Sequence, residues 1–242
     1  MAILLCVSTP EELLAHLPDP SVIPKEQLKD QMLFKFPEQL HPKVDLQVLI
    51  TGVGPINAAL AIGQAFQKLI AEGIKLDLVL VSGLAGAHNL EVHPLGSFCQ
   101  ITEEIWPEYG LHDGHEVIAN AFKWPQWADS PQGAIYDRIK LNDLSYFKLK
   151  PKVLENFPEA ISLTVAGVTA SFIRVQNMWD RYHAPIENME GFALAYGCLR
   201  RDIPCIEIRC ISNKIGPRQS NEKNFDLAHE RLRTLLPTLN LI

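Results

Sequence analysis

The sequence contains few charged residues and few cysteines for its length. Of its 242 residues, 21% are charged, against a typical share of about 25%. Five residues are cysteines, and no two of them are spaced as C-x-x-C. An odd number of cysteines without this spacing argues against a disulfide framework and against a zinc site. The cysteines therefore predict a protein of the reducing cytosol.

A surplus of basic residues is also missing. Lysine and arginine together number 22, aspartate and glutamate number 28, and the net charge is −6. Nucleic-acid-binding proteins usually carry a basic surplus, so a small molecule is the expected partner and a nucleic acid is not. The apolar segment 1–7 is short and has no basic leader, so we predict neither a signal peptide nor a membrane span. The expected location is cytoplasmic.

Short apolar runs alternate with amphipathic segments along the chain. Such runs predict buried strands, and apolar residues three or four positions apart predict helices. We predict strands at residues 2–8, 32–36, 44–51, 76–81, 96–105, 161–168 and 205–211. We predict helices at 10–17, after Pro55, at 144–156 and 174–182, along Met189–Leu199 and around Ala228–Leu236. No repeat or linker divides the chain, so we predict a single α/β domain over residues 1–242.

Three predicted strands end in segments that suit contact with a ligand. Glycine turns stand at Gly52–Gly54 and Gly83–Gly86, and Ser212-Asn213 follows the strand 205–211. Open α/β sheets bind ligands at the carboxyl ends of their strands, and glycine lets backbone N–H groups approach a ligand closely. The spacing matches neither the dinucleotide fingerprint nor a Walker loop. Each glycine turn is also explained by chain reversal alone.

Two glutamates near predicted helix starts are candidates for chemistry. Glu12 lies in the first turn of the helix 10–17, where helix capping alone would explain it. Glu190 lies at the start of a later helix, where an interaction with the helix dipole would explain it. The functional alternative for Glu190 is a carboxylate that binds vicinal hydroxyl groups. The residues alone leave both possibilities open.

An ordered set of segments resembles the purine nucleoside phosphorylase and nucleosidase superfamily. These segments are Gly52-Val53-Gly54, Ser82-Gly83-Leu84-Ala85-Gly86, Val168–Ile173, Asn188-Met189-Glu190-Gly191 and Ile203–Asn213. The resemblance implies a three-layer α/β sandwich with a central mixed β-sheet of the nucleoside phosphorylase type. Within the superfamily, the sequence most resembles the methylthioadenosine-type nucleosidases and, within that group, the futalosine hydrolases.

The resemblance implies cleavage of the N-glycosidic bond of a purine nucleoside, without a metal or an organic cofactor. Its implied catalytic residues are Glu12, which would orient and deprotonate water, and Asn213, beside N7 of the purine. Its implied substrate-binding residues are Leu84, Ala85, Gly86, Phe172 stacked on the base, Ile173, Asn188, Met189 beneath the sugar and Glu190 on the ribose hydroxyls. The resemblance also implies a homodimer or a larger homo-oligomer.

Asn213 departs from the nucleosidase pattern, which has aspartate at this position. A protonated aspartate donates to N7 and accepts from a 6-amino group, whereas an amide donates to a 6-oxo group and accepts from a protonated N7. Asn213 therefore favours hypoxanthine over adenine. Futalosine carries hypoxanthine, and the resemblance implies its hydrolysis to hypoxanthine and dehypoxanthine futalosine in menaquinone biosynthesis. A Ser-Asn turn at a strand end is the alternative explanation of this residue.

Three other functions remain open at this stage. A 6-aminopurine nucleosidase is the first, and Asn213 argues against it. A phosphorylase is the second, but Val81 and Leu84 stand where family phosphorylases have a phosphate-binding arginine and serine, so water is the expected nucleophile. A non-catalytic nucleoside-binding protein is the third. Candidate partners for a substrate carboxylate are Arg174, Arg218, His112 and His115.

Overall fold

The computed structural model describes residues 1–114, 116–217 and 219–242. Its strands are β1 (Ala2–Val7), β2 (Met32–Lys35), β3 (Asp45–Ile50), β4 (Leu78–Ala87), β5 (Phe98–Ile105), β6 (Leu111–His112), β7 (Val117–Ile118), β8 (Arg138–Lys140), β9 (Glu159–Thr164), β10 (Ile186–Asn188) and β11 (Cys205–Lys214). Its α-helices are α1 (Pro10–His16), α2 (Pro55–Ala71), α3 (Pro151–Leu154), α4 (Phe172–Tyr182), α5 (Gly191–Leu199), α6 (Phe225–Leu232) and α7 (Leu235–Thr238).

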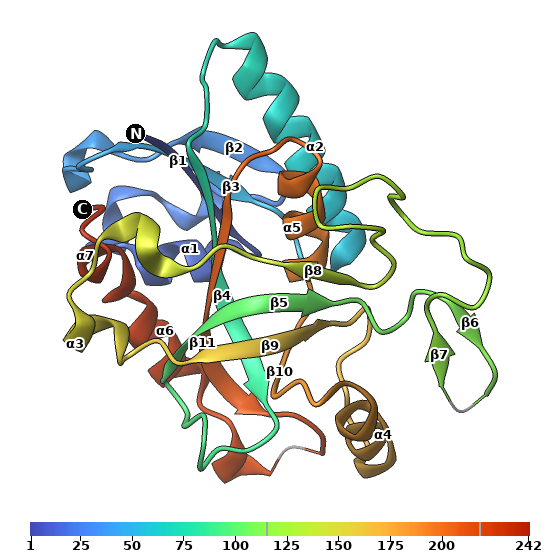
Figure 1. The fold of residues 1–242 in the computed structure, drawn as a ribbon. Coiled ribbons are helices and arrows are strands. Elements are labelled where there is room, and N and C mark those ends of the chain that lie inside the picture. The colour runs from blue at the N-terminus through green and yellow to red at the C-terminus, as the bar shows by residue number, and fades with distance from the viewer. Residues whose placement is uncertain (115, 218) are drawn as a thin grey trace.

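A mixed sheet forms the centre of the molecule (Figure 1). Among the described residues it has nine strands, of which eight follow the order β10-β9-β5-β11-β4-β1-β3-β2, and the ninth, β8, pairs with β5. Strands β3, β1, β4 and β11 run parallel, whereas β2 and β5 are antiparallel to β3 and β11. Strand β10 pairs with both β9 and β4, which closes β4, β11, β5, β9 and β10 into a ring. The predicted mixed sheet is therefore confirmed.

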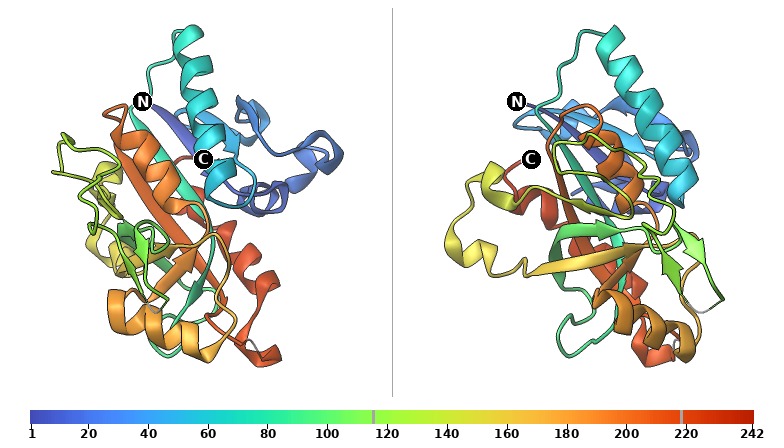
Figure 2. Two further views of the ribbon diagram at one scale, coloured as in Figure 1. Left: turned by 90° about the vertical axis from the view of Figure 1, so that its right-hand side faces the viewer. Right: turned by 45° about the vertical axis from the view of Figure 1, so that its right-hand side comes forward.

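Helices cover the two faces of this sheet (Figure 2). Alternate residues of β1 point to opposite faces, as the pleat of a strand requires. Leu5 packs in a buried cluster with residues of α1, α6 and α7, whereas Cys6 packs in another with residues of α2 and α5. The α/β sandwich of three layers is thus confirmed, with one apolar core on each side of the sheet.

Local sequence sets the helix starts that border the site. Thr9 caps α1, because its Oγ1 accepts a hydrogen bond from the backbone N–H of Glu12 at 3.2 Å. Gly52 and Gly54 have φ values of 81° and 93°, which glycine adopts without strain. This turn joins β3 directly to α2, which begins at Pro55.

Several predicted boundaries are wrong. The helix predicted at 144–156 is instead a 3-10 turn, Leu144–Phe147, followed by α3, because Lys148 takes a left-handed conformation between them. The turn predicted at Gly83–Gly86 lies within β4, which is longer than expected. Strand β9 ends at Thr164. The helix predicted from Met189 begins at Gly191, and the short strand β10 precedes it.

Three further features concern the cysteines, the helices and the short strands. All five cysteines are buried and have free thiols. Within the described ranges, no helix combines the length and the apolar character needed to cross a bilayer. Strands β6 and β7 pair with each other, and β8 pairs with β5.

Candidate active site

A cavity of about 200 Å³ lies at the carboxyl ends of the parallel strands β1, β4 and β11, beside the short strand β10, which is antiparallel to β4. Parallel strands of an α/β sheet end together at such an edge, which is where these folds bind ligands. Its lining residues are Ser8, Thr9, Glu12, Val53, Leu84, Ala85, Gly86, Val168, Glu187, Asn188, Met189, Glu190, Ser212, Asn213 and Phe225. Three carboxylates therefore face one small space.

Glu12 is held in the cavity by backbone N–H groups. Ser8 donates to its Oε2 and Leu84 donates to its Oε1, each at 2.8 Å. The side chain is buried, and burial together with repulsion from Glu190 raises the pKa of Glu12. A fixed carboxylate with a raised pKa is suited to accept a proton near neutral pH.

The close approach of α1 to β4 depends on Gly83 in β4 and on His16 in α1. A Cβ at Gly83 would lie only 2.7 Å from Oε1 of Glu12, so a side chain at this position would displace the carboxylate. His16, one helical turn after Glu12, is completely buried and bonds to Ser82 Oγ through Nε2 at 2.8 Å. Its Nδ1 bonds to the carbonyl of Glu12 at 2.7 Å. Burial lowers the pKa of His16 to about 4, so this link between α1 and β4 is neutral at physiological pH.

Glu190 lies immediately before α5 and faces the cavity from the other side. The backbone N–H of Gly54 donates to its Oε1 at 3.0 Å, and Arg209 Nη1 lies 3.6 Å from its Oε2. Burial alone would lower the pKa of Arg209, but the carboxylates of Glu207 and Glu190 raise it. The guanidinium is therefore a permanent buried charge behind the cavity.

A second pair of buried carboxyl groups stands behind Arg209. Arg209 Nε donates to Glu207 Oε1 at 2.7 Å. Oε1 of Glu104 and Oε1 of Glu207 both lie against Gly191, 2.5 and 2.7 Å from the position that a Cβ there would take. Burial and mutual repulsion raise the pKa of Glu104, and burial raises that of Glu207. Asn188 joins this network to the cavity, because its Nδ2 donates to Glu104 at 2.6 Å and its Oδ1 accepts from the backbone N–H of Glu190 at 2.9 Å.

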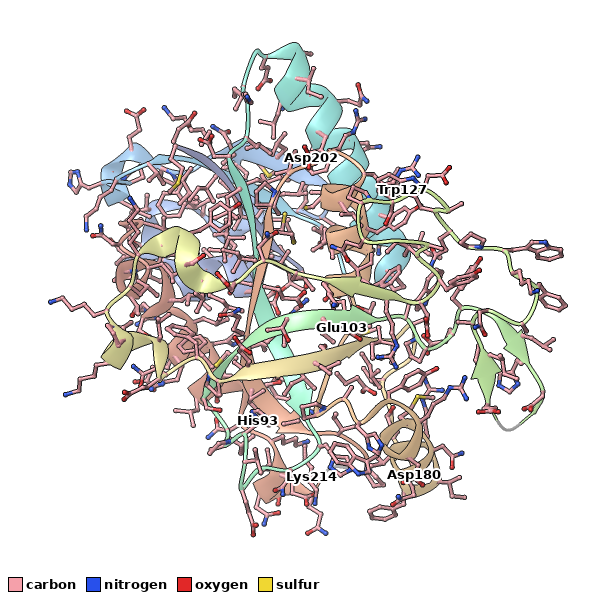
Figure 3. All side chains as sticks on the ribbon, viewed as in Figure 1. His93, Glu103, Trp127, Asp180, Asp202 and Lys214 are labelled. Atoms are coloured by element: carbon pink, nitrogen blue, oxygen red, sulfur yellow. The ribbon has the colours of Figure 1, made fainter. Side chains whose placement is uncertain are left out.

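Asn213 reaches the cavity through an irregularity in β11. The register against β4 shifts between Ile211 and Asn213, which leaves Ser212 as an extra residue. Such bulges turn a side chain to a new direction next to functional sites. Asn213 Nδ2 donates to the carbonyl of Lys214 at 2.8 Å, and its Oδ1 accepts from Ser212 Oγ at 2.9 Å. One N–H and one lone pair of the amide remain available. Figure 3 labels the adjacent Lys214.

The structure brings together most of the predicted site residues. The cavity is lined by Glu12, Leu84, Ala85, Gly86, Asn188, Met189, Glu190 and Asn213. Phe172 and Ile173 are not among its lining residues. They begin α4 and are each 75% exposed, whereas Val168 of the same segment does line the cavity. Their predicted contacts with the base therefore stay predictions.

A larger pocket of about 880 Å³ lies between α4 and the β6–β7 hairpin. It is lined by Arg174 and His112, two of the four residues considered for a substrate carboxylate. Arg174 Nη2 already bonds to Glu108 at 2.8 Å. The other two residues, His115 and Arg218, lie outside the described residues.

Sequence reasoning assigned no role to four buried charged residues of this region: Glu104, Glu187, Glu207 and Arg209. Of these, only Arg209 was recognised from the sequence as a charge in a strand that could pair with a carboxylate. Glu207 and Arg209 alternate with apolar residues in the buried part of β11. Charged residues are almost never fully buried unless they are paired, so this alternation was the available signal. In the part of the chain that the structure describes, no group of three or more His, Cys, Asp or Glu side chains is placed to hold a metal ion.

The mixed sheet between helices, with its carboxylate-lined cavity at the strand ends, defines an α/β protein of the class that binds small polar ligands at this edge. The family model of the phosphorylase superfamily matches residues 11–240. The chain therefore belongs to the phosphorylase superfamily.

Two curated relatives carry the same name. The chain is 29% identical to the futalosine hydrolase of Thermus thermophilus over 197 residues, which cover 79% of this chain and 76% of the relative. It is 26% identical to the futalosine hydrolase of Streptomyces coelicolor over 182 residues, which cover 71% and 68%.

The fold is also found in a solved structure of a nucleosidase. This is the 5′-methylthioadenosine/S-adenosylhomocysteine nucleosidase from Helicobacter pylori with butyl-thio-DADMe-Immucillin-A. The match has a TM-score of 0.70 at 18% identity and covers 99% of this chain and 97% of the nucleosidase.

Proposed function

We propose that this protein hydrolyses the N-glycosidic bond of a 6-oxopurine nucleoside, namely futalosine, and releases hypoxanthine and dehypoxanthine futalosine. The observation that carries the proposal is the meeting of Glu12, Glu190 and Asn213 in one cavity. The shared name of the two curated relatives supports it. The reaction would be a step of menaquinone biosynthesis.

In this mechanism Glu12 accepts a proton from water, whose oxygen forms a bond to C1′ of the ribose. The bond between C1′ and N9 breaks, and its electrons go to the base, which takes up a proton at N7 from solvent water. Glu12 then returns the proton that it accepted to solvent. The two N–H groups that hold Glu12 orient its carboxylate. General-base assistance of this kind typically increases the rate by about 100- to 10,000-fold.

Glu190 binds the ribose hydroxyls and stabilises the positive charge that develops on the sugar. Carboxylates aimed at a developing oxocarbenium ion lower the barrier, because the interaction strengthens toward the transition state. Its contact with Arg209 fixes its orientation. Met189, which lines the same cavity, packs beneath the sugar.

Water is favoured over phosphate as the nucleophile by the charges of the cavity. None of the described lining residues is arginine or lysine, and three are glutamates: Glu12, Glu187 and Glu190. A phosphate dianion needs charged donors and would be repelled by these carboxylates. The position of Arg209 behind Glu190 does not alter this, because its guanidinium is engaged by Glu207 and Glu190.

Asn213 selects the base in this proposal. Its free N–H donates to O6 of hypoxanthine, and its free lone pair accepts from the protonated N7. Phe172 and Ile173 contact the base after α4 has moved toward the cavity. Burying a polar group against the wrong partner is costly, so a 6-amino base binds more weakly.

Product analysis tests the proposal. The protein is incubated with futalosine or aminofutalosine, each with and without phosphate, and the products are separated by chromatography. We expect hypoxanthine from futalosine at the same rate with and without phosphate, and a much slower release of adenine from aminofutalosine. The Glu12→Gln variant should lose about 100-fold or more in rate.

Each alternative predicts a different outcome of the same assay. A sugar 1-phosphate that forms only with phosphate would make the protein a phosphorylase. A faster release of adenine would make it a 6-aminopurine nucleosidase. Tight binding of purines without turnover, unchanged in Glu12→Gln, would make it a binding protein.

We further propose that the protein is cytoplasmic and forms a homodimer or a larger homo-oligomer. The five free thiols support a reducing compartment. Exposed apolar side chains on the outer face of α2 support self-association, with Ile56, Leu60 and Ile70 exposed by 84%, 53% and 59%. Light scattering coupled to gel filtration would give the mass, and a monomer at micromolar concentration would contradict the proposed assembly.

A further inference from the structure

His16 joins the helix that carries Glu12 to the strand that Glu12 faces. Its side chain is completely buried. Nδ1 of the ring lies 2.7 Å from the carbonyl oxygen of Glu12, and Nε2 lies 2.8 Å from Oγ of Ser82. The ring therefore bonds to α1 and to β4 at the same time, although His16 is not among the residues that line the cavity.

These two contacts determine which nitrogen of the ring carries the hydrogen. A carbonyl oxygen only accepts hydrogen bonds, so Nδ1 carries the hydrogen and donates it to Glu12. Burial lowers the pKa of His16 to about 4, so the ring is neutral at physiological pH and Nε2 carries a lone pair. Ser82 Oγ donates to this lone pair. Ser82 is itself buried, and a buried hydroxyl group without a partner would destabilise the fold.

The bond between His16 and Ser82 lies where strand pairing no longer holds these elements together. The pairing between β1, which leads into α1, and β4 ends immediately before Ser82. Gly83 and Leu84 follow, and both meet Glu12: a Cβ at Gly83 would lie 2.7 Å from its Oε1, and Leu84 donates to the same oxygen at 2.8 Å. The distance between α1 and β4 at the carboxylate is therefore set by side-chain contacts.

We propose that His16, together with Ser82, positions the carboxylate of Glu12 for proton transfer by fixing the distance between α1 and β4. The inference rests on the proposed function and adds to it a positioning residue, which acts through the general base without touching the substrate. A displacement of reacting groups by about 1 Å can lower a rate by about 100-fold. The bond thus affects catalysis because it prevents such a displacement of Glu12.

Two replacements of His16 separate the two bonds of its ring. Glutamine places its amide nearly as far from the backbone as Nε2, so His16→Gln keeps an acceptor for Ser82 Oγ and with it the link between α1 and β4. Asparagine places its amide close to the position of Nδ1, so His16→Asn keeps only the donor to the carbonyl of Glu12, inside α1. Ser82→Ala removes the same link from the side of the strand.

His93→Asn is the matched control. His93 is also a buried histidine, but it lies between β4 and β5 and outside the cavity lining (Figure 3). The same substitution at this position should leave kcat unchanged. Circular dichroism and thermal melting establish that each variant is folded before its kinetics are measured.

We expect kcat on futalosine to fall by about 10- to 100-fold in His16→Asn and in Ser82→Ala, and by about 3-fold or less in His16→Gln. KM should stay within about 3-fold of the wild type, because Glu12 acts on water and not on the bound nucleoside. His16→Asn combined with Ser82→Ala should be no slower than the slower of the two single variants, because both substitutions remove the same link.

Nuclear magnetic resonance of the backbone amides gives a second measurement, which needs no substrate. An amide hydrogen that is bonded to a buried carboxylate resonates at low field and exchanges slowly with solvent, and Leu84 has such a bond to Glu12. In His16→Asn and Ser82→Ala the Leu84 resonance should move upfield, and its hydrogen should exchange about 10-fold faster or more. In His16→Gln and His93→Asn it should keep its wild-type properties.

The inference would be overturned by wild-type kcat in both His16→Asn and Ser82→Ala, by an unchanged Leu84 amide in both, or by a slower reaction in His16→Gln than in His16→Asn. The amide measurement also separates the inference from the proposed function. A wild type that does not hydrolyse futalosine, with the expected amide changes in the variants, would remove the function and leave the positioning of Glu12 standing. Hydrolysis with unchanged kcat and unchanged amides would do the reverse.

Discussion

At the scale of single residues, the position of Glu12 depends on the missing side chain of Gly83. A Cβ there would lie 2.7 and 2.9 Å from the two carboxylate oxygens, and these are the movable end of a side chain. We predict that Gly83→Ala displaces the carboxylate and lowers kcat on futalosine by about 100-fold or more, because general-base assistance is lost. Steady-state kinetics and thermal melting measure this.

Gly63→Ala is the control for this prediction. Gly63 lies in α2, and a Cβ there would meet no atom within 4 Å, so kcat should stay unchanged. Alanine in place of glycine inside a helix should also raise stability by up to about 1 kcal/mol. A folded Gly83→Ala variant with the kcat of the wild type would show that Glu12 is not the base.

Asn213 supports a second prediction at this scale. In Asn213→Asp an ionised carboxylate has no hydrogen for O6, whereas a protonated one can donate to N7 and accept from a 6-amino group. The ratio of kcat/KM for futalosine to that for aminofutalosine should fall by about 10-fold or more. Competition between the two substrates in one reaction measures this ratio directly. An unchanged ratio would remove Asn213 from base recognition.

The sequence predicted those residues of the candidate site that lie at or shortly after the ends of strands. Glu12 and Asn213 meet because β1 and β11 are parallel to β4 and their carboxyl ends share one edge. Glu190 joins them because the short strand β10 before it pairs antiparallel with the last residues of β4. Phe172 is different, because its direction depends on how α4 rotates against the rest of the molecule, which local sequence does not set. Arg209 could be flagged as a charge in a buried strand, but its partners come from other parts of the chain.

At the scale of elements, long periodic segments were predictable and short ones were not. Helix α2 and the strands on either side of it have clear apolar patterns. Strand β10 has only three residues and exists because it pairs with β9 and β4, so its own sequence carries little signal. The same holds for β8, which forms on the edge of β5.

The neighbouring strands β5 and β11 carry the buried pair Glu104 and Glu207, and this pair makes stability depend on pH. Both pKa values are raised in the folded protein. Above the ordinary carboxyl range the folded state therefore holds a proton that the unfolded chain has released, and stability falls as pH rises. The slope is about 1.4 kcal/mol per pH unit for each such proton.

Glu207→Gln should remove most of this dependence. The amide keeps an oxygen for Arg209 Nε and can donate to Glu104, as a protonated carboxyl group would. The free energy of unfolding, measured with urea from pH 5 to pH 9, should fall less with pH in Glu207→Gln than in the wild type. Glu103→Gln should keep the wild-type slope, because the Glu103 side chain is partly exposed and pairs with Arg138 instead of with this buried pair. Equal slopes in all three proteins would mean that the pair is fully ionised.

At the scale of the whole molecule, the closure of the sheet joins the two sides of the cavity. Glu12 and Asn213 belong to the side built on β1, β4 and β11, whereas Glu190 follows β10. The pairing of β10 with β4 connects these sides by backbone hydrogen bonds. The site is therefore part of the central sheet, and opening the cavity widely would break strand pairs.

This arrangement predicts that residues 1–242 unfold as one cooperative unit and that a ligand in the cavity stabilises all of it. A ligand at 100 times its Kd stabilises the folded state by about 2.7 kcal/mol, which for a chain of this size raises Tm by roughly 5–10 °C. Calorimetric scans with hypoxanthine should show a single transition that moves as a whole, and adenine at the same concentration should move it less. If the protein instead gave two transitions, of which hypoxanthine shifted only one, the chain would consist of two domains and the cavity would belong to one of them.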